Sequence, residues 1–83
     1  MEIRESWAVS RDRIERFFLE QPEVIAETEG FSFGDCLIRL TDLPPRRLGP
    51  VEMSYTLVEM TGGDRDTEEI YRRFFLRFIS AGG

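Results

Sequence analysis

The sequence predicts an α+β fold, a small antiparallel sheet of about four strands with two helices on one face. Four segments alternate apolar and polar residues, which is the period of a half-buried strand, and two others repeat apolar residues every three to four positions, as an amphipathic helix does. Their order along the chain is strand, helix, three strands, helix. With 83 residues, the chain is expected to form one α+β domain, 1–83.

The first strand is expected within residues 2–9, because Ile3 and Trp7 alternate there with charged or small residues. Ser10 has the position of a helix N-cap, and the helix that it starts should stop at Gln21 because Pro22 disfavours helical geometry in the residue before it. The apolar face of this helix comprises Ile14, Phe17 and Phe18.

Three further segments predict the rest of the sheet. Residues 23–29 favour a strand with one acidic, solvated face, and residues 36–41 a second strand reached through a hairpin turn at Gly30 or at Gly34-Asp35. Residues 42–50 contain three prolines and one glycine, so we expect an extended loop there. Residues 51–60 alternate most regularly and predict the clearest strand of the chain.

The last helix is predicted after Gly62-Gly63, with Asp66 and Glu69 at the spacing of a capping box. Its apolar arc is wider than one packing contact needs, so we expect this helix to support self-association as well as the core. The arc comprises Ile70, Tyr71, Phe74, Phe75, Phe78 and Ile79, with Leu76 near the polar side.

The composition disfavours catalysis. The chain contains no histidine, lysine or asparagine and one cysteine, so it lacks a Ser–His or Cys–His pair, a Schiff-base lysine and the ligands of a structural zinc site. We therefore expect no enzyme activity, no cofactor and no bound metal. Cys36 opens an apolar strand and is expected to be a buried, inert thiol.

Charge and hydropathy also narrow the partners. A net charge of −5 disfavours binding to nucleic acid, whose phosphates attract basic surfaces. No apolar run approaches the roughly 18–20 residues of a membrane span, and the N-terminus does not resemble a secretory leader. A single cysteine agrees with a reducing compartment, so we expect a cytoplasmic protein.

The leading interpretation is a non-catalytic protein-interaction module, a small adaptor, regulator or accessory subunit that forms a homodimer and binds a protein partner. Prolines lower the entropy that a binding segment loses, and adjacent guanidinium groups pair well with carboxylate or phosphate groups. The candidate partner-binding residues are Pro44, Pro45, Arg46 and Arg47 in the expected loop and Phe75, Leu76 and Ile79 on the last helix.

Two alternatives stay open. The terminal Gly82-Gly83 resembles the ends of ubiquitin-like modifiers and of sulfur carriers such as the small subunit of molybdopterin synthase. That resemblance implies a C-terminal carboxylate adenylated by a partner enzyme, whereas the β-grasp fold of those families opens with a hairpin instead of the strand and helix expected here. The second alternative is a small inhibitor that presents acidic surface to a nucleic-acid-binding protein.

Overall fold

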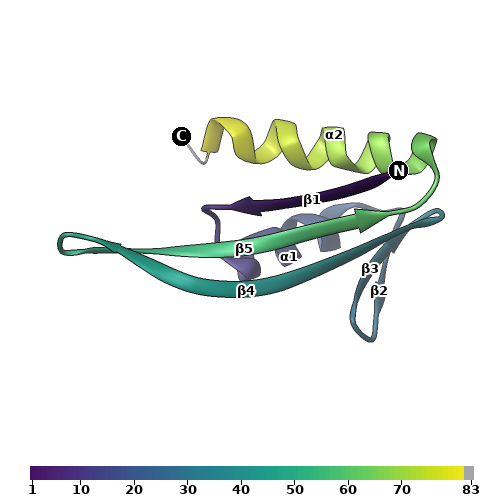
Figure 1. Ribbon diagram of the computed structural model, residues 1–83. Helices are drawn as coiled ribbons and strands as arrows, with labels where there is room; N and C mark the ends of the chain where they lie inside the picture. Colours follow the sequence, from purple (N-terminus) through teal and green to yellow (C-terminus); the bar gives the residue numbers. More distant parts are fainter. Residues whose placement is uncertain (82–83) are drawn as a thin grey trace.

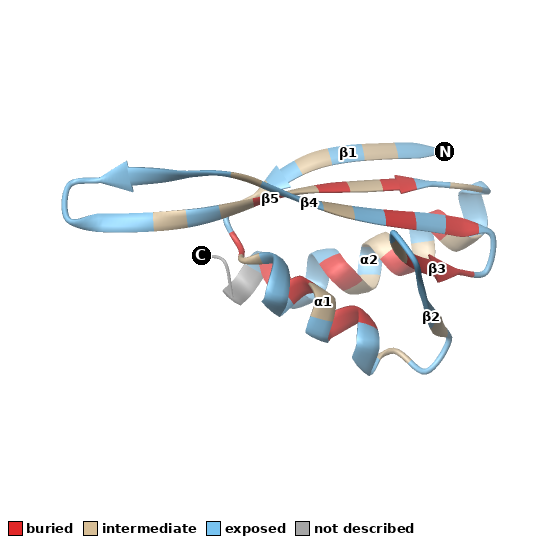
Figure 2. Ribbon diagram, turned by 90° about the horizontal axis from the view of Figure 1, so that it is seen from below, coloured by how far each residue is buried: buried red, intermediate tan, exposed pale blue. Residues whose placement is uncertain are grey.

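The computed structural model describes residues 1–81 and shows five strands and two helices (Figure 1). The strands form one antiparallel sheet in the order β1-β5-β4-β3-β2, and both helices lie on the same face of it (Figure 2). This confirms the α+β class. The elements are β1 (Glu2–Trp7), α1 (Arg11–Glu20), β2 (Val24–Glu27), β3 (Gly30–Phe33), β4 (Cys36–Leu48), β5 (Val51–Thr61) and α2 (Asp64–Ala81).

The expected number of strands was one too low, because both candidate turns are used. One reversal precedes Gly30 and joins β2 to β3, and the second lies at Gly34-Asp35 and joins β3 to β4. Gly34 has a φ of 58°, a left-handed conformation that glycine adopts without steric cost. The short segment between the two turns therefore forms a strand of its own.

Helix α1 has the predicted limits. The backbone oxygen of Ser10 accepts a hydrogen bond from the Ile14 N–H at 3.3 Å, although the Ser10 side chain makes no capping bond. At the other end Gln21 leaves the helical conformation directly before Pro22, and its N–H still donates to the Phe18 oxygen at 3.0 Å.

Helix α2 begins at Asp64, two residues earlier than the predicted capping box, so that prediction was wrong. The carboxylate that satisfies the helix start comes from the β3–β4 turn: the Gly63 N–H donates to Asp35 Oδ1 at 3.1 Å. In return the Asp35 N–H donates to Asp66 Oδ2 at 3.1 Å. Asp66 therefore connects α2 to the sheet instead of capping its own helix.

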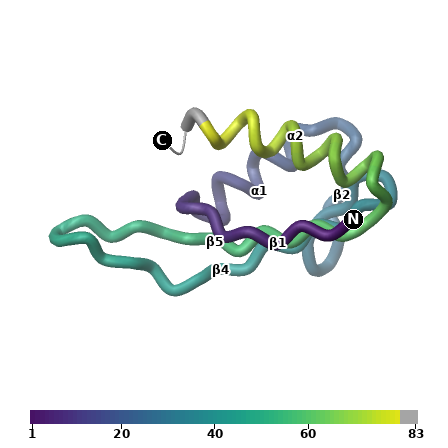
Figure 3. The backbone as a smooth tube through the Cα atoms, turned by 45° about the horizontal axis from the view of Figure 1, so that its top comes forward, coloured from purple at the N-terminus to yellow at the C-terminus, as the bar shows by residue number. Residues whose placement is uncertain are grey.

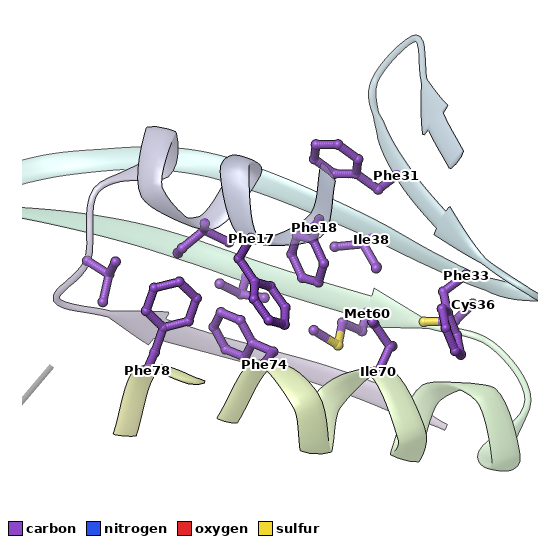
Figure 4. Packing of buried hydrophobic residues seen from close by; sticks show 13 residues of the cluster. Phe17, Phe18, Phe31, Phe33, Cys36, Ile38, Met60, Ile70, Phe74 and Phe78 are labelled. Carbon is purple, nitrogen blue, oxygen red and sulfur yellow. The ribbon is translucent and has the colours of Figure 1, made fainter. Parts of the chain in front are cut away.

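The core lies between the sheet and the two helices (Figure 4). Phe74 is fully buried at its centre, with ring centroids 4.9 Å from Trp7, 6.0 Å from Phe18 and 5.3 Å from Phe78. Burying one such side chain contributes about 1.5–3 kcal/mol. The buried apolar residues are Val9, Ile14, Phe17, Phe18, Phe31, Phe33, Cys36, Ile38, Val58, Met60, Ile70, Phe74 and Phe78.

The described helices include none that is long and apolar enough to cross a membrane.

Candidate protein-interaction surface

The most prominent surface feature is a two-stranded arm, residues 43–55, made of the distal halves of β4 and β5. Strand β1 pairs with β5 only as far as Trp7 opposite Thr56, and β3 pairs with β4 only around Phe31–Phe33. Beyond those points β4 and β5 have only each other, and they project past both helices (Figures 1 and 3). No residue of the arm is buried.

The arm corrects the expectation of a loop at residues 42–50. Pro44 and Pro45 lie together opposite Ser54, in a bulge where the register shifts between Leu43 and Arg46. A bulge on an edge strand tolerates residues that cannot donate a backbone hydrogen bond, so the prolines do not end the strand. The chain reverses instead at Gly49-Pro50, where Gly49 has a φ of 63°.

One face of the arm is apolar. Cross-strand partners share a face, and the register pairs Leu43 with Tyr55, Arg46 with Met53 and Leu48 with Val51. Because Thr56 and Val58 point toward the helices, the alternation along β5 directs these pairs to the helix-free side of the sheet. We call Leu43, Leu48, Val51, Met53 and Tyr55 the apolar face of the arm.

The apolar face of the arm is accessible, because Leu48 is 63% and Val51 56% exposed. The Arg46 guanidinium lies 5.3 Å from the centre of the Tyr55 ring, an attractive cation–π contact that holds a charge at the border of the apolar face. On the opposite face Arg47 Nε lies 3.9 Å from Glu52 Oε2. The arm is therefore amphipathic.

The four predicted residues Pro44 to Arg47 all lie on this arm, while the other three lie on α2. Phe75 is 36% exposed and packs edge-on against Trp7, with 5.9 Å between ring centroids. Leu76 and Ile79 are 57% and 50% exposed, so the expected division of the helix between core and surface agrees with the structure. We call Phe75, Leu76 and Ile79 the α2 patch.

A shallow cavity of about 350 Å³ lies on the helix-free side of the sheet, and its charged side chains already have partners. Arg39 Nη2 lies 3.2 Å from Glu29 Oε2, and Glu27 accepts a hydrogen bond from the Ser32 hydroxyl at 2.9 Å. Strand β2 ends at Glu27 and Glu29 lies beyond it in a turn, so the two are not a carboxylate pair on one strand face.

The ionisable groups with shifted pKa values are structural in their surroundings. Burial raises the pKa of the Cys36 thiol, which is fully covered in the core as predicted. Burial and the hydrogen bond to Glu5 raise the pKa of Tyr71 to about 12. Arg73 donates to Glu69 at 2.8 Å and to Glu23 at 3.0 Å, which lowers the pKa of both carboxyl groups.

Sequence reasoning missed the exposed apolar residues of the arm, although the alternation of 51–60 was visible. It also missed that Arg73 joins α2 to the segment before β2, through Glu23 and an oxygen of Gln21 at 3.3 Å. Among the described residues no group of three or more Cys, Asp or Glu side chains is placed to hold a metal ion.

Comparison of the chain with protein-family models, with curated proteins and with solved structures finds no match.

Proposed function

We propose that this chain is a non-catalytic protein-interaction module, a small adaptor, regulator or accessory subunit, which binds a protein partner through the apolar face of the arm. The observation that carries the proposal is that the arm projects from the body with this face uncovered. The partner site is thus wider than the predicted segment Pro44 to Arg47 and includes apolar residues from both strands.

The energetics of a two-stranded ribbon support this role. An isolated hairpin is marginally stable in water, and its strands gain stability when an apolar face packs against another surface. Full burial of each Leu or Val side chain is worth about 1.5–3 kcal/mol, and the arm leaves Leu48 and Val51 more than half exposed. A partner that covers the face supplies this missing burial.

The charges around the face support a protein partner. Interfaces combine an apolar centre with a polar rim in which arginine is frequent. Arg46 borders the apolar face beside Tyr55, and Arg47 lies on the neighbouring side of the same strand. These two guanidinium groups would pair with carboxylates at the rim of the partner's surface.

Serine substitutions at Leu43 and Leu48 test the proposal, because both residues lie on β4 and leave β5 unchanged. We expect the double variant to keep its fold and to lose binding to its cellular protein partner by roughly tenfold or more, about 1.4 kcal/mol. Partners recovered with the unmodified chain by affinity capture are identified by mass spectrometry, and each is then titrated as a purified protein.

Two further variants complete the experiment. Arg46→Ala with Arg47→Ala should weaken binding less than the serine pair while the melting temperature changes little, since exposed ion pairs contribute at most about 1 kcal/mol each. Leu76→Ser on the α2 patch serves as the matched apolar control, and it should leave binding unchanged. Undiminished affinity of the Leu43→Ser, Leu48→Ser variant would contradict the proposal.

The other interpretations remain predictions. The residues Gly82-Gly83, on which the modifier or sulfur-carrier alternative depends, lie outside the described residues. The acidic-inhibitor alternative depends on the net charge of −5, and several carboxylates that would contribute to it are paired with arginines, such as Glu59 with Arg4 at 3.5 Å and Glu20 with Arg77 at 3.7 Å.

A further inference from the structure

We propose that a second copy of this chain pairs with β5 along Val51–Tyr55, antiparallel, with Met53 opposite Met53 of the second copy. The two sheets would then form one continuous sheet in which the two arms lie side by side. This inference rests on the proposed function as an interaction module and names one partner, but it uses the edge of the arm, whereas the protein partner uses its apolar face.

The edges of the sheet differ in how they are protected against pairing. β1 carries the inward-pointing Glu5, whose carboxylate accepts hydrogen bonds from Trp7 Nε1 at 3.0 Å and from the Tyr71 hydroxyl at 2.9 Å. The outer edge of β4 is interrupted by Pro44 and Pro45, and β2 has four residues. Inward charges, prolines and short strands are the usual means of preventing edge-to-edge association.

Among the strand edges of the described chain, the segment Val51–Tyr55 of β5 has none of these features. It is regular, contains no proline, and lies beyond the end of β1 at Trp7. It also has five residues, the usual length of a strand. This segment is therefore open to a further strand, and that strand would continue the line of β1.

The hydrogen bonds at the other end of β5 show which backbone groups face this edge. Met1 and Gly62 exchange two bonds, of 3.1 Å from the Gly62 N–H and 2.7 Å from the Met1 amino group. Backbone groups of an antiparallel strand alternate in direction with a period of two, and β5 keeps an unbroken register with β1. Counting back from Gly62, the N–H and C=O groups of Glu52 and Ser54 point to the open edge.

A two-fold axis at Met53 is the register that fits both copies. It places Glu52 of each copy opposite Ser54 of the other, so the outward backbone groups form hydrogen-bonded pairs. An axis at Glu52 would set two carboxylates directly opposite each other, which is destabilising. An axis at Ser54 would require the edge of Thr56, which Trp7 already occupies.

The side chains agree with the Met53 register on both faces. On the apolar face Val51 meets Tyr55 of the second copy, and Met53 meets its own symmetry mate, so apolar residues contact only apolar residues. On the other face Glu52 has Ser54 opposite it and keeps Arg47 as its neighbour on β4. Pairing would also join the two apolar faces into one surface twice as large, which strengthens the case for a protein partner there.

Disulfide trapping with single cysteines tests this register. Residues facing each other in a non-hydrogen-bonded antiparallel pair have Cα atoms about 4.5 Å apart, within the range that a disulfide spans. Under mild oxidation at roughly 50 µM, a concentration at which micromolar affinity populates the dimer, Met53→Cys should cross-link to itself. Val51→Cys and Tyr55→Cys should each stay monomeric alone and cross-link when mixed.

Two controls keep the result interpretable. The unmodified chain reports on Cys36, which is buried and should not cross-link. Leu76→Cys reports on the α2 patch, and preferential cross-linking there would assign the homodimer to that helix and overturn the proposal, as would equal or absent cross-linking at the three arm positions. If trapping fails while the Leu43→Ser, Leu48→Ser variant still loses its protein partner, the dimer is refuted and the proposed function stands.

Discussion

Replacing Phe74 with alanine is expected to destabilise the protein by about 3–5 kcal/mol, the range for truncating a fully buried phenylalanine. Its ring contacts aromatic residues from β1, α1 and α2 at once, and none of these elements can move inward without losing its other contacts. Since a domain of this size has about 5–15 kcal/mol of total stability or less, much of the variant should unfold near 37 °C.

Urea denaturation followed by circular dichroism measures this loss. Phe75→Ala is the matched control one residue away, because its ring is 36% exposed and leaves a smaller cavity. We expect it to cost well under half as much as Phe74→Ala. Equal effects of the two substitutions would contradict the placement of the core.

Replacing Gly30 with alanine is expected to cost on the order of 3 kcal/mol, because a β-carbon there would press against the carbonyl oxygen of Ile38, with the carbonyl carbon at 3.2 Å. That oxygen belongs to the backbone of β4 and cannot turn aside as a flexible side chain would. The β3–β4 pairing, which holds Phe31 over the core, would have to open.

Gly49→Ala provides the comparison for Gly30→Ala. A β-carbon at Gly49 meets nothing within 4 Å, so only the left-handed backbone conformation is penalised, by about 1 kcal/mol. Thermal unfolding of the two variants should therefore differ clearly. A melting temperature of Gly30→Ala at or above that of Gly49→Ala would show that the close approach of β3 to β4 is wrong.

Local signals predicted most of the fold. Ser10 and Pro22 define the limits of α1 by steric and hydrogen-bonding rules that act over a few residues, and those limits agree with the structure. The start of α2 was misplaced because its capping carboxylate comes from Asp35, a residue 28 positions away from the Gly63 N–H that it accepts. A long-range contact of this kind leaves no local pattern.

The candidate site was predicted in part for a similar reason. Pro44 and Pro45 normally end a strand, and only the pairing partner shows that they occupy a bulge opposite Ser54. The alternation of Val51, Met53 and Tyr55 predicts an apolar face, but whether that face is covered depends on where β1 and β3 stop. The length of neighbouring strands is a property of the whole sheet.

Residue-resolved amide hydrogen exchange of the arm, measured by NMR over a series of protein concentrations, tests most directly the claim that the arm is where this protein makes contacts. In a monomer the amide hydrogens of Glu52 and Ser54 face solvent, whereas those of Met53 and Tyr55 face β4. The account predicts that exchange at Glu52 and Ser54 slows as the concentration rises, while exchange at Met53 changes little. Fast exchange at Glu52 and Ser54 at every concentration, in a protein that associates or binds its partner elsewhere, would contradict it.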